Sequence, residues 1–269
     1  MKFVQITILI LCIYSFLPAQ TWDEFNNDLD YSWQAGEDLG HVILHPTDKD
    51  LTAFLFGTSA VITGYFFDEP VRTFSLSHQN TIAGKIAEID NYYGHGKYMT
   101  TIPVLIYAGG FLSDNTDIQN TGLKLSQAVF YTGILTLFIK EFTGRSRPFL
   151  NEGKHHFEPL PLCSERRSFF SGHSSFSFAV STVLANESDN LAWKILCYGA
   201  AGTAAGARIY HDKHWLSDTI AGALVGYAIG NFISRQAKKH DKKLRMLNET
   251  DRKNKNADII FYFSIPLGK

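Results

Sequence analysis

The sequence is poor in cysteine and has no excess of charge of either sign. Three cysteines among 269 residues provide no disulfide framework, so the fold cannot depend on a set of crosslinks. The formal net charge of −1 argues against nucleic acid as the main partner, because binding to a phosphate backbone usually needs a marked excess of Lys and Arg. Any recognition of an anion must therefore depend on a few residues gathered locally.

Long uncharged apolar runs are also scarce, and no internal repeat is apparent. The longest such run, Leu51 to Phe67, is at the lower limit for a membrane span, and Lys124, Gln127, Lys194 and Asp218 interrupt the other apolar segments. The mean hydropathy is only −0.07. These features favour a soluble or peripherally attached body over an integral membrane protein.

The first twenty residues have the composition of an export signal. Lys2 supplies a basic start, residues 4–17 are largely apolar, and Pro18, Ala19 and Gln20 provide a small-residue end. We predict a signal peptide over residues 1–20, with a retained anchor helix as the alternative. Either interpretation places the remaining chain outside the cytoplasm, in the periplasm or cell envelope.

Cys12 would leave with the signal peptide, so two cysteines would remain. Cys163 lies in a loop segment and Cys197 in an apolar segment. An oxidising compartment permits one disulfide between them. The lack of a framework instead favours an unpaired Cys163 and a buried Cys197.

Apolar residues are concentrated in five segments separated by joints rich in Gly, Pro and short polar residues. The segments cover roughly residues 51–67, 98–112, 123–142, 174–205 and 215–234, and the fourth is interrupted at residues 186–190. Their lengths and the lack of strict alternation favour helices over strands. We therefore predict an all-α helical bundle.

The predicted bundle occupies residues 76–234, between two other regions. Residues 21–75 form a lead-in, irregular or partly helical at its start, and a first helix; residues 235–269 form a charged extension. We interpret this extension as a solvated helix, with contact to anionic lipid as the alternative. Aromatic and aliphatic residues alternate over 259–266, which predicts a short C-terminal strand or a packed tail.

Small residues follow one helical face in two parts of the predicted bundle. One is the Ala- and Gly-rich run 200–206, and the other is the ladder of Gly222, Gly226 and Gly230. Small residues at this spacing allow helix backbones to approach closely. The pattern suits membrane helices and tightly packed soluble bundles equally.

Lys140 and Arg147 are two cations near the end of the third apolar segment. They are seven positions apart, which on a helix places both on one face. Gly144 is expected to loosen the helix between them, and Pro148 to stop it. The alternative is a pair of solvated cations, but both charges could also point toward one anion.

Ser171, Gly172 and His173 directly precede a predicted helix. A helix start offers unpaired backbone N–H groups and a positive dipole end, and Gly172 lets the main chain approach a bound anion. His173 would then lie beside that anion. The simpler interpretation is an N-cap by Ser171 with an incidental histidine.

Arg208, His214 and Asp218 form a third group. His214 and Asp218 are four positions apart, the spacing that brings two side chains together on one helix face. The carboxylate could then hold one imidazole nitrogen and leave the other as a nucleophile. Four positions after His211 stands Trp215 and not a carboxylate, so we expect His211 at the rim of the site and not as the nucleophile. His155 and His156 lie in a loop, where we expect exposure, with a contact to substrate as the alternative.

The three groups together resemble the signature of the type 2 phosphatidic acid phosphatase and vanadium haloperoxidase superfamily. Lys140 with Arg147-Pro148, then Ser171-Gly172-His173, then Arg208, His214 and Asp218 occur in the family order. The resemblance covers about residues 120–232. Each motif alone is weak, but three in order are specific.

This resemblance implies a fold of the same helical kind and a role for each matched residue. His214 would attack phosphorus to give a phosphohistidine, Asp218 would orient it, and His173 would protonate the leaving oxygen. The phosphate oxygens would be bound by Lys140, Arg147, Ser171, Gly172 and Arg208. Three cations can stabilise this charge without a metal, so neither a metal nor a cofactor is expected.

Two positions depart from the family pattern. Phe170 stands where the second motif usually opens with proline, and Ala207 stands where the third usually opens with serine. Neither change removes a charged or titrating group. They put the fine geometry of the site in doubt, but not the reaction class.

The expected activity is that of a phosphoric monoester hydrolase acting on phosphate esters or pyrophosphates, most naturally those of lipids. Phosphatidate, isoprenoid pyrophosphates, lipid A phosphates and small soluble esters all stay open as substrates, as does the oligomeric state. The alternatives are a vanadate-dependent haloperoxidase and a non-catalytic envelope protein that binds anionic lipid. The chain has little room for the broader oxidant pocket of a haloperoxidase.

Overall fold

The computed structural model describes residues 19–262, and the side chains from Trp22 to Lys243 and of Met246. Residues 1–18 of the predicted signal peptide lie outside the described part. The chain divides into two compact units, Met1–Ala53 and Phe54–Lys269. The predicted domain limits stay predictions, although α10 continues without a break through the expected limit at position 235.

The first unit contains the helix α2 (Ala19–Leu44). The lead-in was expected to be irregular or partly helical, and this helix covers most of it. Contacts one turn apart support this helix: Trp33 Nε1 donates to Glu37 Oε1 at 2.9 Å, and the Ser32 hydroxyl donates to the Asp28 carbonyl at 2.7 Å. Such local pairs stabilise a helix without needing a continuous apolar stripe.

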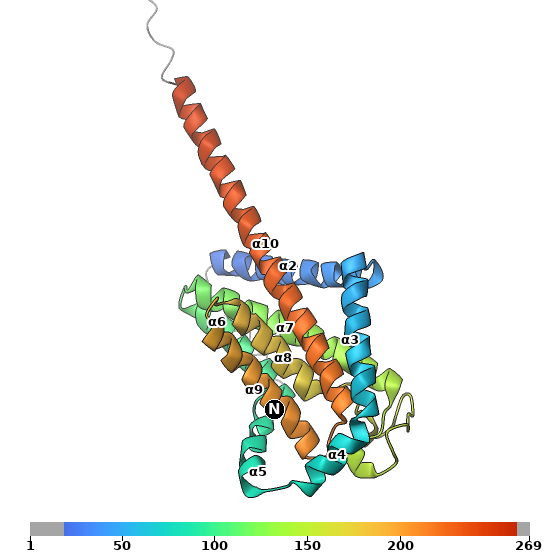
Figure 1. The fold of residues 1–269 in the computed structure, drawn as a ribbon. Helices are drawn as coiled ribbons and strands as arrows, with labels where there is room; N and C mark the ends of the chain where they lie inside the picture. The colour runs from blue at the N-terminus through green and yellow to red at the C-terminus, as the bar shows by residue number, and fades with distance from the viewer. Residues whose placement is uncertain (1–18, 263–269) are drawn as a thin grey trace, which may run out of the picture. The chain divides into compact units, whose positions relative to one another are not determined.

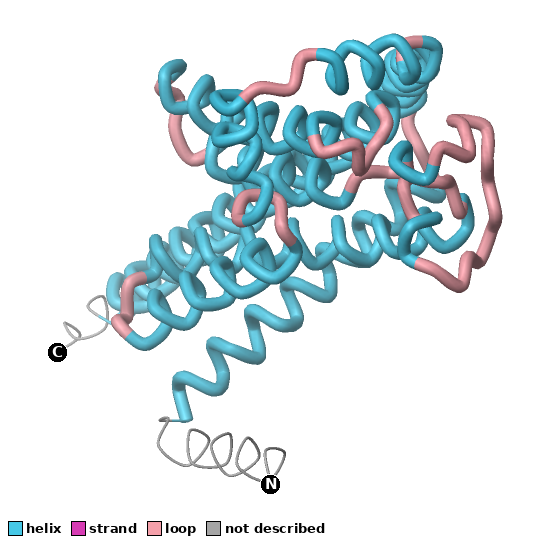
Figure 2. The backbone as a smooth tube through the Cα atoms, turned by 90° about the horizontal axis from the view of Figure 1, so that it is seen from below, coloured by secondary structure: helices cyan, strands magenta, loops and turns pink. Residues whose placement is uncertain are grey.

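The remaining elements confirm the predicted all-α fold (Figures 1 and 2), and no strand occurs among residues 19–262. In chain order they are α3 (Asp48–Phe66), α4 (Asp68–Ser77), α5 (Thr81–Ala87), η1 (Glu88–Asn91), α6 (Gly96–Leu112), α7 (Thr116–Thr143), η2 (Pro148–Leu150), η3 (Ser164–Arg166), α8 (Gly172–Asn186), α9 (Leu191–Tyr210) and α10 (Leu216–Tyr262). The predicted C-terminal strand is wrong for residues 259–262, which are the last turn of α10; residues 263–266 lie outside the described part.

Asparagine side chains define several of the helix starts. Asn115 accepts a hydrogen bond from the Ile118 N–H at the start of α7, and Asn190 accepts one from the Trp193 N–H at the start of α9. Each bond satisfies an N–H group that a helix start leaves without a partner. Asn190 thus separates α8 from α9 where the sequence showed a polar interruption.

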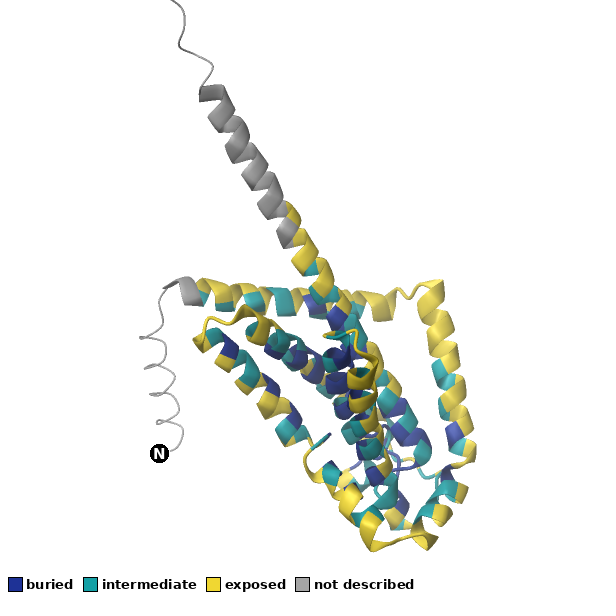
Figure 3. Ribbon diagram, turned by 60° about the vertical axis from the view of Figure 1, so that its left-hand side comes forward, coloured by how far each residue is buried: buried dark blue, intermediate teal, exposed yellow. Residues whose placement is uncertain are grey.

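Helix α8 is the central element of the second unit. It packs against α7, α9 and α10, and most of its residues are buried, within the dark blue interior of Figure 3. On α10, a Cβ added to Gly222 would lie 2.4 Å from the Ser171 carbonyl oxygen, and one added to Gly226 would lie 2.1 Å from that of Ser175. The glycine ladder of α10 therefore brings the two backbones together. The glycines of α9 have no such neighbour: a Cβ added to Gly202 would meet no other part of the protein within 4 Å.

Within residues 19–262, two helices are long and apolar enough to cross a membrane, namely α7 and the part of α10 from Leu216 to Lys243. Helices α3 and α4, bent by 54° at their junction, add a third if they form one broken span. Charges that counted against spans are paired, as Lys124 is with Glu187 at 2.6 Å. Large apolar side chains such as Phe130 and Leu137 are exposed on α7. These findings favour a membrane protein over the soluble body expected from hydropathy.

Candidate active site

The ends of four helices bring the three predicted groups together. Lys140 lies in the last turn of α7 and Arg208 in the last turn of α9, where positive side chains are favoured. Ser171 is the N-cap of α8, and Asp218 lies in the first turn of α10. The Ser171 N–H donates to the Asp218 carbonyl at 3.0 Å, which joins the starts of α8 and α10 directly.

Lys140 and Arg147 do not share a helix face as the spacing predicted. Helix α7 ends at Thr143, because Gly144 adopts a left-handed conformation with φ 56°. A Cβ at this position would lie 1.6 Å from the Glu158 carbonyl oxygen, so a side chain cannot fit there. Arg147 instead reaches the site from the loop that follows α7.

Arg147 and Arg208 each have a buried Nε–H group without a hydrogen-bond partner. Buried guanidinium donors are normally paired, so these two are available to an anion. Burial and the like charge of Arg208 lower the pKa of Arg147. Lys140 donates to the Arg167 and Ser168 carbonyls at 2.5 and 3.2 Å, which leaves a third ammonium hydrogen.

Asp90 fixes the other edge of the Arg208 guanidinium. Its carboxylate accepts a 2.6 Å hydrogen bond from Nη1 of Arg208, and both side chains are almost fully buried. His211 Nε2 lies 3.7 Å from the same carboxylate, with its ring partly exposed. This partial exposure agrees with the expected place of His211 at the rim. Asp90 therefore holds the Arg208 guanidinium in one orientation through Nη1, while the Nε–H of Arg208 has no hydrogen-bond partner.

His214 is buried, and its ring is held from the Nδ1 side. Nδ1 lies 3.3 Å from the Ser168 hydroxyl and 3.6 Å from the Asp218 carboxylate. His214 precedes α10 instead of sharing a helix face with Asp218, so the two side chains meet across a turn. Burial, with the positive charges of Lys140 and Arg208, holds the pKa of His214 well below its ordinary value. The ring is therefore neutral and retains a lone pair.

His173 lies in the first turn of α8, partly buried. Burial and the charge of Arg208 lower the pKa of His173 to about 2. The His95 ring makes an edge contact with the His173 ring, with 5.6 Å between the centroids. Gly94 allows this approach, because its φ is 89° and a Cβ there would lie 2.7 Å from the His173 carbonyl oxygen. The loop before α6 thus lies against His173.

Ser171 and Gly172 occupy the helix start that the sequence suggested. The Ser171 hydroxyl accepts from the Ser174 N–H at 3.4 Å and from the Ser174 hydroxyl at 3.1 Å. It acts as an N-cap here, and the Gly172 backbone lies beside the Lys140 side chain, whose Cε would be 3.8 Å from an added Cβ. Both departures from the family pattern, Phe170 and Ala207, are buried.

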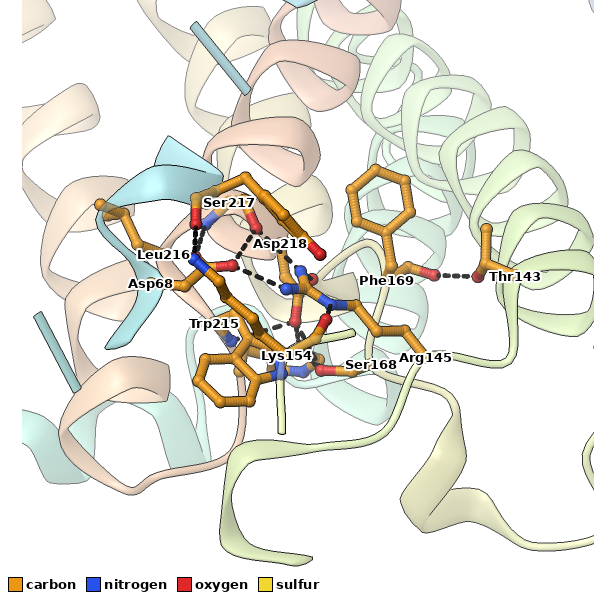
Figure 4. A network of polar contacts seen from close by, with 12 residues as sticks. Asp68, Thr143, Arg145, Lys154, Ser168, Phe169, Trp215, Leu216, Ser217 and Asp218 are labelled. Atoms are coloured by element: carbon orange, nitrogen blue, oxygen red, sulfur yellow. Dashed lines mark hydrogen bonds and ion pairs between the residues drawn. The ribbon is translucent and has the colours of Figure 1, made fainter. Parts of the chain in front are cut away.

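Four residues of this site were not predicted from the sequence: Asp68, Asp90, Arg145 and Ser168. Arg145 and Asp68 lie in a buried network with Asp218 (Figure 4). The only signal for Arg145 was its place two positions before Arg147, and nothing in the sequence marked Asp68, which lies on α4. Distant segments meet here through the fold, which a motif cannot describe.

The other predicted polar residues lie apart from this network. His155 is exposed and contacts the Tyr65 hydroxyl at 2.5 Å, while His156 is half-buried beside Ser146. Cys163 is exposed and Cys197 is buried, and both are free, as the sequence favoured. In the described part of the chain, no group of three His, Cys, Asp or Glu side chains is arranged to hold a metal ion.

Comparisons with known proteins agree with this architecture. The chain is 29% identical over 172 residues to lipid phosphate phosphatase 1 of Arabidopsis thaliana, which is 52% of each chain, and 26% identical over 148 residues to a PA-phosphatase related-family protein of Dictyostelium discoideum. It spans about half the length of these two relatives, 52% and 55%. It is also 32% identical over 84 residues to the lipid A 1-phosphatase of Porphyromonas gingivalis, which is 30% of this chain and 19% of that relative.

A solved structure shares the fold. The transmembrane PAP2 type phosphatidylglycerolphosphate phosphatase from Bacillus subtilis superposes with a TM-score of 0.51 at 21% identity, covering 72% of this chain and 96% of that one. The model of the PAP2 superfamily matches residues 121–242, which include all three predicted groups. This chain therefore carries a domain of the PAP2 superfamily at residues 121–242.

Proposed function

We propose that this chain is a membrane-associated lipid phosphatase that works through a phosphohistidine on His214. The observation that carries the proposal is the pair of buried, unpaired Nε–H donors of Arg147 and Arg208 beside a buried neutral imidazole. Unpaired buried donors cost free energy unless a ligand uses them. A phosphate group would supply the negative charge and the acceptor oxygens with which these donors can form hydrogen bonds.

The first step is attack by Nε2 of His214 on phosphorus. The new N–P bond forms as the bond from phosphorus to the leaving oxygen breaks, and His173 gives its proton to that oxygen. Asp218 and Ser168 face Nδ1, so they hold the ring and offset the positive charge that it gains. In the second step water attacks phosphorus and loses a proton to His173 while the N–P bond breaks, which releases phosphate and returns the lone pair to Nε2 of His214.

The role of His173 depends on the substrate. Its pKa of about 2 means that the ring is neutral without an anion, because it is buried near Arg208. A phosphate group bound to Arg147 and Arg208 would offset these cations and favour the protonated ring. His173 would then carry the proton only when a leaving oxygen is present.

Charge stabilisation in this proposal comes from Lys140, Arg147 and Arg208, with the Gly172 amide at the start of α8. These groups are preorganised by Asp90 and by the loop carbonyls, so they need little rearrangement as charge develops on phosphorus. Phosphoryl transfer requires mainly positioning and charge stabilisation. We therefore propose that no metal ion takes part.

A phosphorylated lipid is the substrate class that we propose. The relatives are named for lipid phosphate, lipid A and phosphatidylglycerolphosphate, and large apolar side chains cover the outside of α7. Candidate spans that end at the site would present it to lipid head groups. The predicted export would place this reaction outside the cytoplasm.

The test is phosphate release by the purified full chain in detergent and EDTA. Phosphatidate, an isoprenoid pyrophosphate and a chromogenic soluble ester serve as substrates. We expect release from at least one lipid, a phosphoenzyme that is labile in acid, and loss of both in His214→Ala. His45→Ala, at an exposed position, is the control. Turnover by His214→Ala, or loss of wild-type activity in EDTA, contradicts the proposal.

A further inference from the structure

Arg145 is a fully buried cation between two carboxylates (Figure 4). Its Nη1 donates to Asp218 Oδ1 and its Nη2 to Asp68 Oδ2, each at 2.6 Å. Nη1 also donates to the Ser217 hydroxyl at 2.8 Å, and Nε donates to the Lys154 carbonyl at 3.2 Å. Each guanidinium nitrogen thus has a protein partner. Arg145 therefore differs from Arg147 and Arg208, whose Nε–H groups are free for an anion.

Asp68 joins this cation to the start of α10. Its Oδ1 accepts the backbone N–H of Ser217 at 2.8 Å, and its Oδ2 accepts the Ser217 hydroxyl at 2.8 Å. Ser217 is the second residue of α10, where N–H groups lack partners within the helix. Asp68 therefore acts as a cap supplied by another helix, α4, and it fixes the turn that carries Asp218.

Every oxygen of the Asp218 carboxylate has a defined donor. Oδ1 accepts from Arg145, while Oδ2 accepts from the Ser168 hydroxyl at 2.5 Å and from the Trp215 N–H at 3.0 Å. The rotation of this carboxylate is thus set by its surroundings, and His214 is the ring that it faces. A change in any of these donors would move the group that orients His214.

Aromatic rings enclose the Arg145 guanidinium. Its Cζ lies 5.0 Å from the centre of the Tyr65 ring and 5.4 Å from that of Trp215. Cation–π contact of this kind favours a flat guanidinium over an ammonium group. A lysine could carry the charge but could not bind both carboxylates with fixed geometry.

We propose that Arg145, held by Asp68, is a positioning residue that fixes the Asp218 carboxylate and through it the ring of His214. The two carboxylates and one guanidinium leave one net negative charge on the Nδ1 side of His214. Lys140, Arg147 and Arg208 act on the same ring with positive charge. The Asp218 carboxylate and the Ser168 hydroxyl face Nδ1 of the ring, which favours a proton on Nδ1 and a lone pair on Nε2. The inference rests on the proposed phosphatase function.

The kinetic test compares Arg145→Gln, Arg145→Lys and Asp68→Asn with the wild type, using the substrate that the wild type hydrolyses best. Because Arg145 is not among the residues proposed to bind phosphate, we expect kcat to fall about 10–100-fold in Arg145→Gln, comparable to the loss of a partner that orients a metal-binding histidine, while KM and vanadate inhibition stay unchanged. We expect smaller losses of kcat in the other two variants. Arg166→Gln is the matched control, because Arg166 pairs with Glu152 on a loop and does not contact His214.

A second measurement does not depend on turnover. Nitrogen-15 NMR of histidine-labelled protein, with His214 assigned by difference from His214→Ala, reports which ring nitrogen carries the proton. We expect the Nδ1–H form in the wild type and in Arg166→Gln, and a mixture of forms in Arg145→Gln and Asp68→Asn.

Two results would overturn the inference: unchanged kcat together with an unchanged His214 tautomer in Arg145→Gln, or a rise in KM in place of the fall in kcat. An inactive wild type defeats the proposed function instead. In that case the tautomer still decides whether Arg145 positions His214. If Arg145→Gln fails to fold, Asp68→Asn and Arg145→Lys carry both measurements.

Discussion

The hydroxyl of Ser168 donates a 2.5 Å hydrogen bond to the Asp218 carboxylate. The same oxygen lies 3.3 Å from Nδ1 of His214, closer than the 3.6 Å between Nδ1 and Asp218. A hydroxyl can donate one hydrogen bond and accept another, so Ser168 can bridge the ring and the carboxylate. Ser168 itself is fully buried, so bulk water does not compete for these hydrogen bonds.

Replacing Ser168 with alanine should therefore weaken the hold on His214. We expect kcat of Ser168→Ala to fall about tenfold, equivalent to about 1.4 kcal/mol, the size of one net hydrogen bond in a buried site. KM should stay near its wild-type value, because the contacts of this hydroxyl are with His214 and Asp218 and not with the cations proposed to bind phosphate. Steady-state kinetics at the pH of maximal activity measures both constants.

Ser164→Ala is the matched control for this change. Ser164 lies in the same connection between α7 and α8 but is exposed, and its hydroxyl contacts only the neighbouring Glu165 at 3.2 Å. Equal kcat values for the two alanine variants would show that Ser168 has no part in holding the ring.

Helices α3 and α6 to α10 could be predicted from the sequence because each contains an apolar segment, whereas α4 and α5 lie outside the predicted segments. Asn190 marks the break between α8 and α9. The end of α7 was predicted too late, at Pro148, because Gly144 ends the helix at Thr143 where it was expected only to loosen it. The lead-in was harder, since α2 depends on polar contacts one turn apart, such as that of Trp33 with Glu37. Charge content misled the membrane prediction, because Lys124 is paired with Glu187 in the fold.

The site could be predicted only as far as its motifs extend. The cations and histidines of the three groups were recognisable because their order and spacing resemble a family signature, although Arg147 reaches the site from a loop and His214 from the turn before α10. Asp68 and Asp90 were out of reach, because each is a single carboxylate far along the chain from the cation that it pairs with. Helix packing decides which of these residues meet, and no local sequence pattern predicts that packing.

Arg147 and Arg208 should bind the phosphate oxygens through their free Nε–H groups. Replacing either with lysine keeps the charge but removes the fixed fork of donors. We expect inhibition by vanadate to weaken about tenfold or more in Arg147→Lys and Arg208→Lys, the effect of losing one hydrogen bond to a charged group. The concentration of vanadate that halves activity is the measurement.

Arg166→Lys controls for general effects of the Arg-to-Lys change, because Arg166 pairs with carboxylates on a loop. Vanadate inhibition in this control should match the wild type. Unchanged inhibition in both Arg147→Lys and Arg208→Lys would remove the main support for the anion site.

Gly226 should be needed for the contact between α10 and α8. A Cβ at Gly226 would lie 2.1 Å from the Ser175 carbonyl oxygen, and this backbone cannot move aside without shifting the start of α8. We expect Gly226→Ala to lower the free energy of unfolding by about 1–3 kcal/mol or more, as overpacking does. It should also lower activity, because α8 carries Ser171 and His173.

Gly202→Ala provides the opposite case on α9. Nothing lies within 4 Å of a Cβ at Gly202, so alanine gains helix propensity of about 1 kcal/mol at no steric cost. We expect the thermal midpoint to rise slightly in Gly202→Ala and to fall in Gly226→Ala. Equal midpoints for the two variants would contradict the close approach of α8 and α10.

The lowered pKa of His173 should make stability depend on pH. In the unfolded chain a histidine takes up a proton below about pH 6.5, whereas the folded His173 takes one up only near 2. The unfolded state therefore binds more protons between these values, so stability is complete above about pH 6.5 and falls as the pH is lowered. Each such group contributes a slope of about 1.4 kcal/mol per pH unit inside this window. The pKa of His214 is also lowered, so His214 adds to the fall in stability at low pH.

Replacing His173 with phenylalanine removes one of these protons from the unfolded state. We expect the free energy of unfolding of His173→Phe to fall less steeply than that of the wild type between pH 6.5 and pH 4, as measured by denaturation in detergent at a series of pH values. His45→Phe, at an exposed position, should keep the wild-type slope. A slope in His173→Phe equal to that of the wild type would mean that His173 is already protonated in the folded chain, and the role of a bound phosphate in protonating it would then be unnecessary.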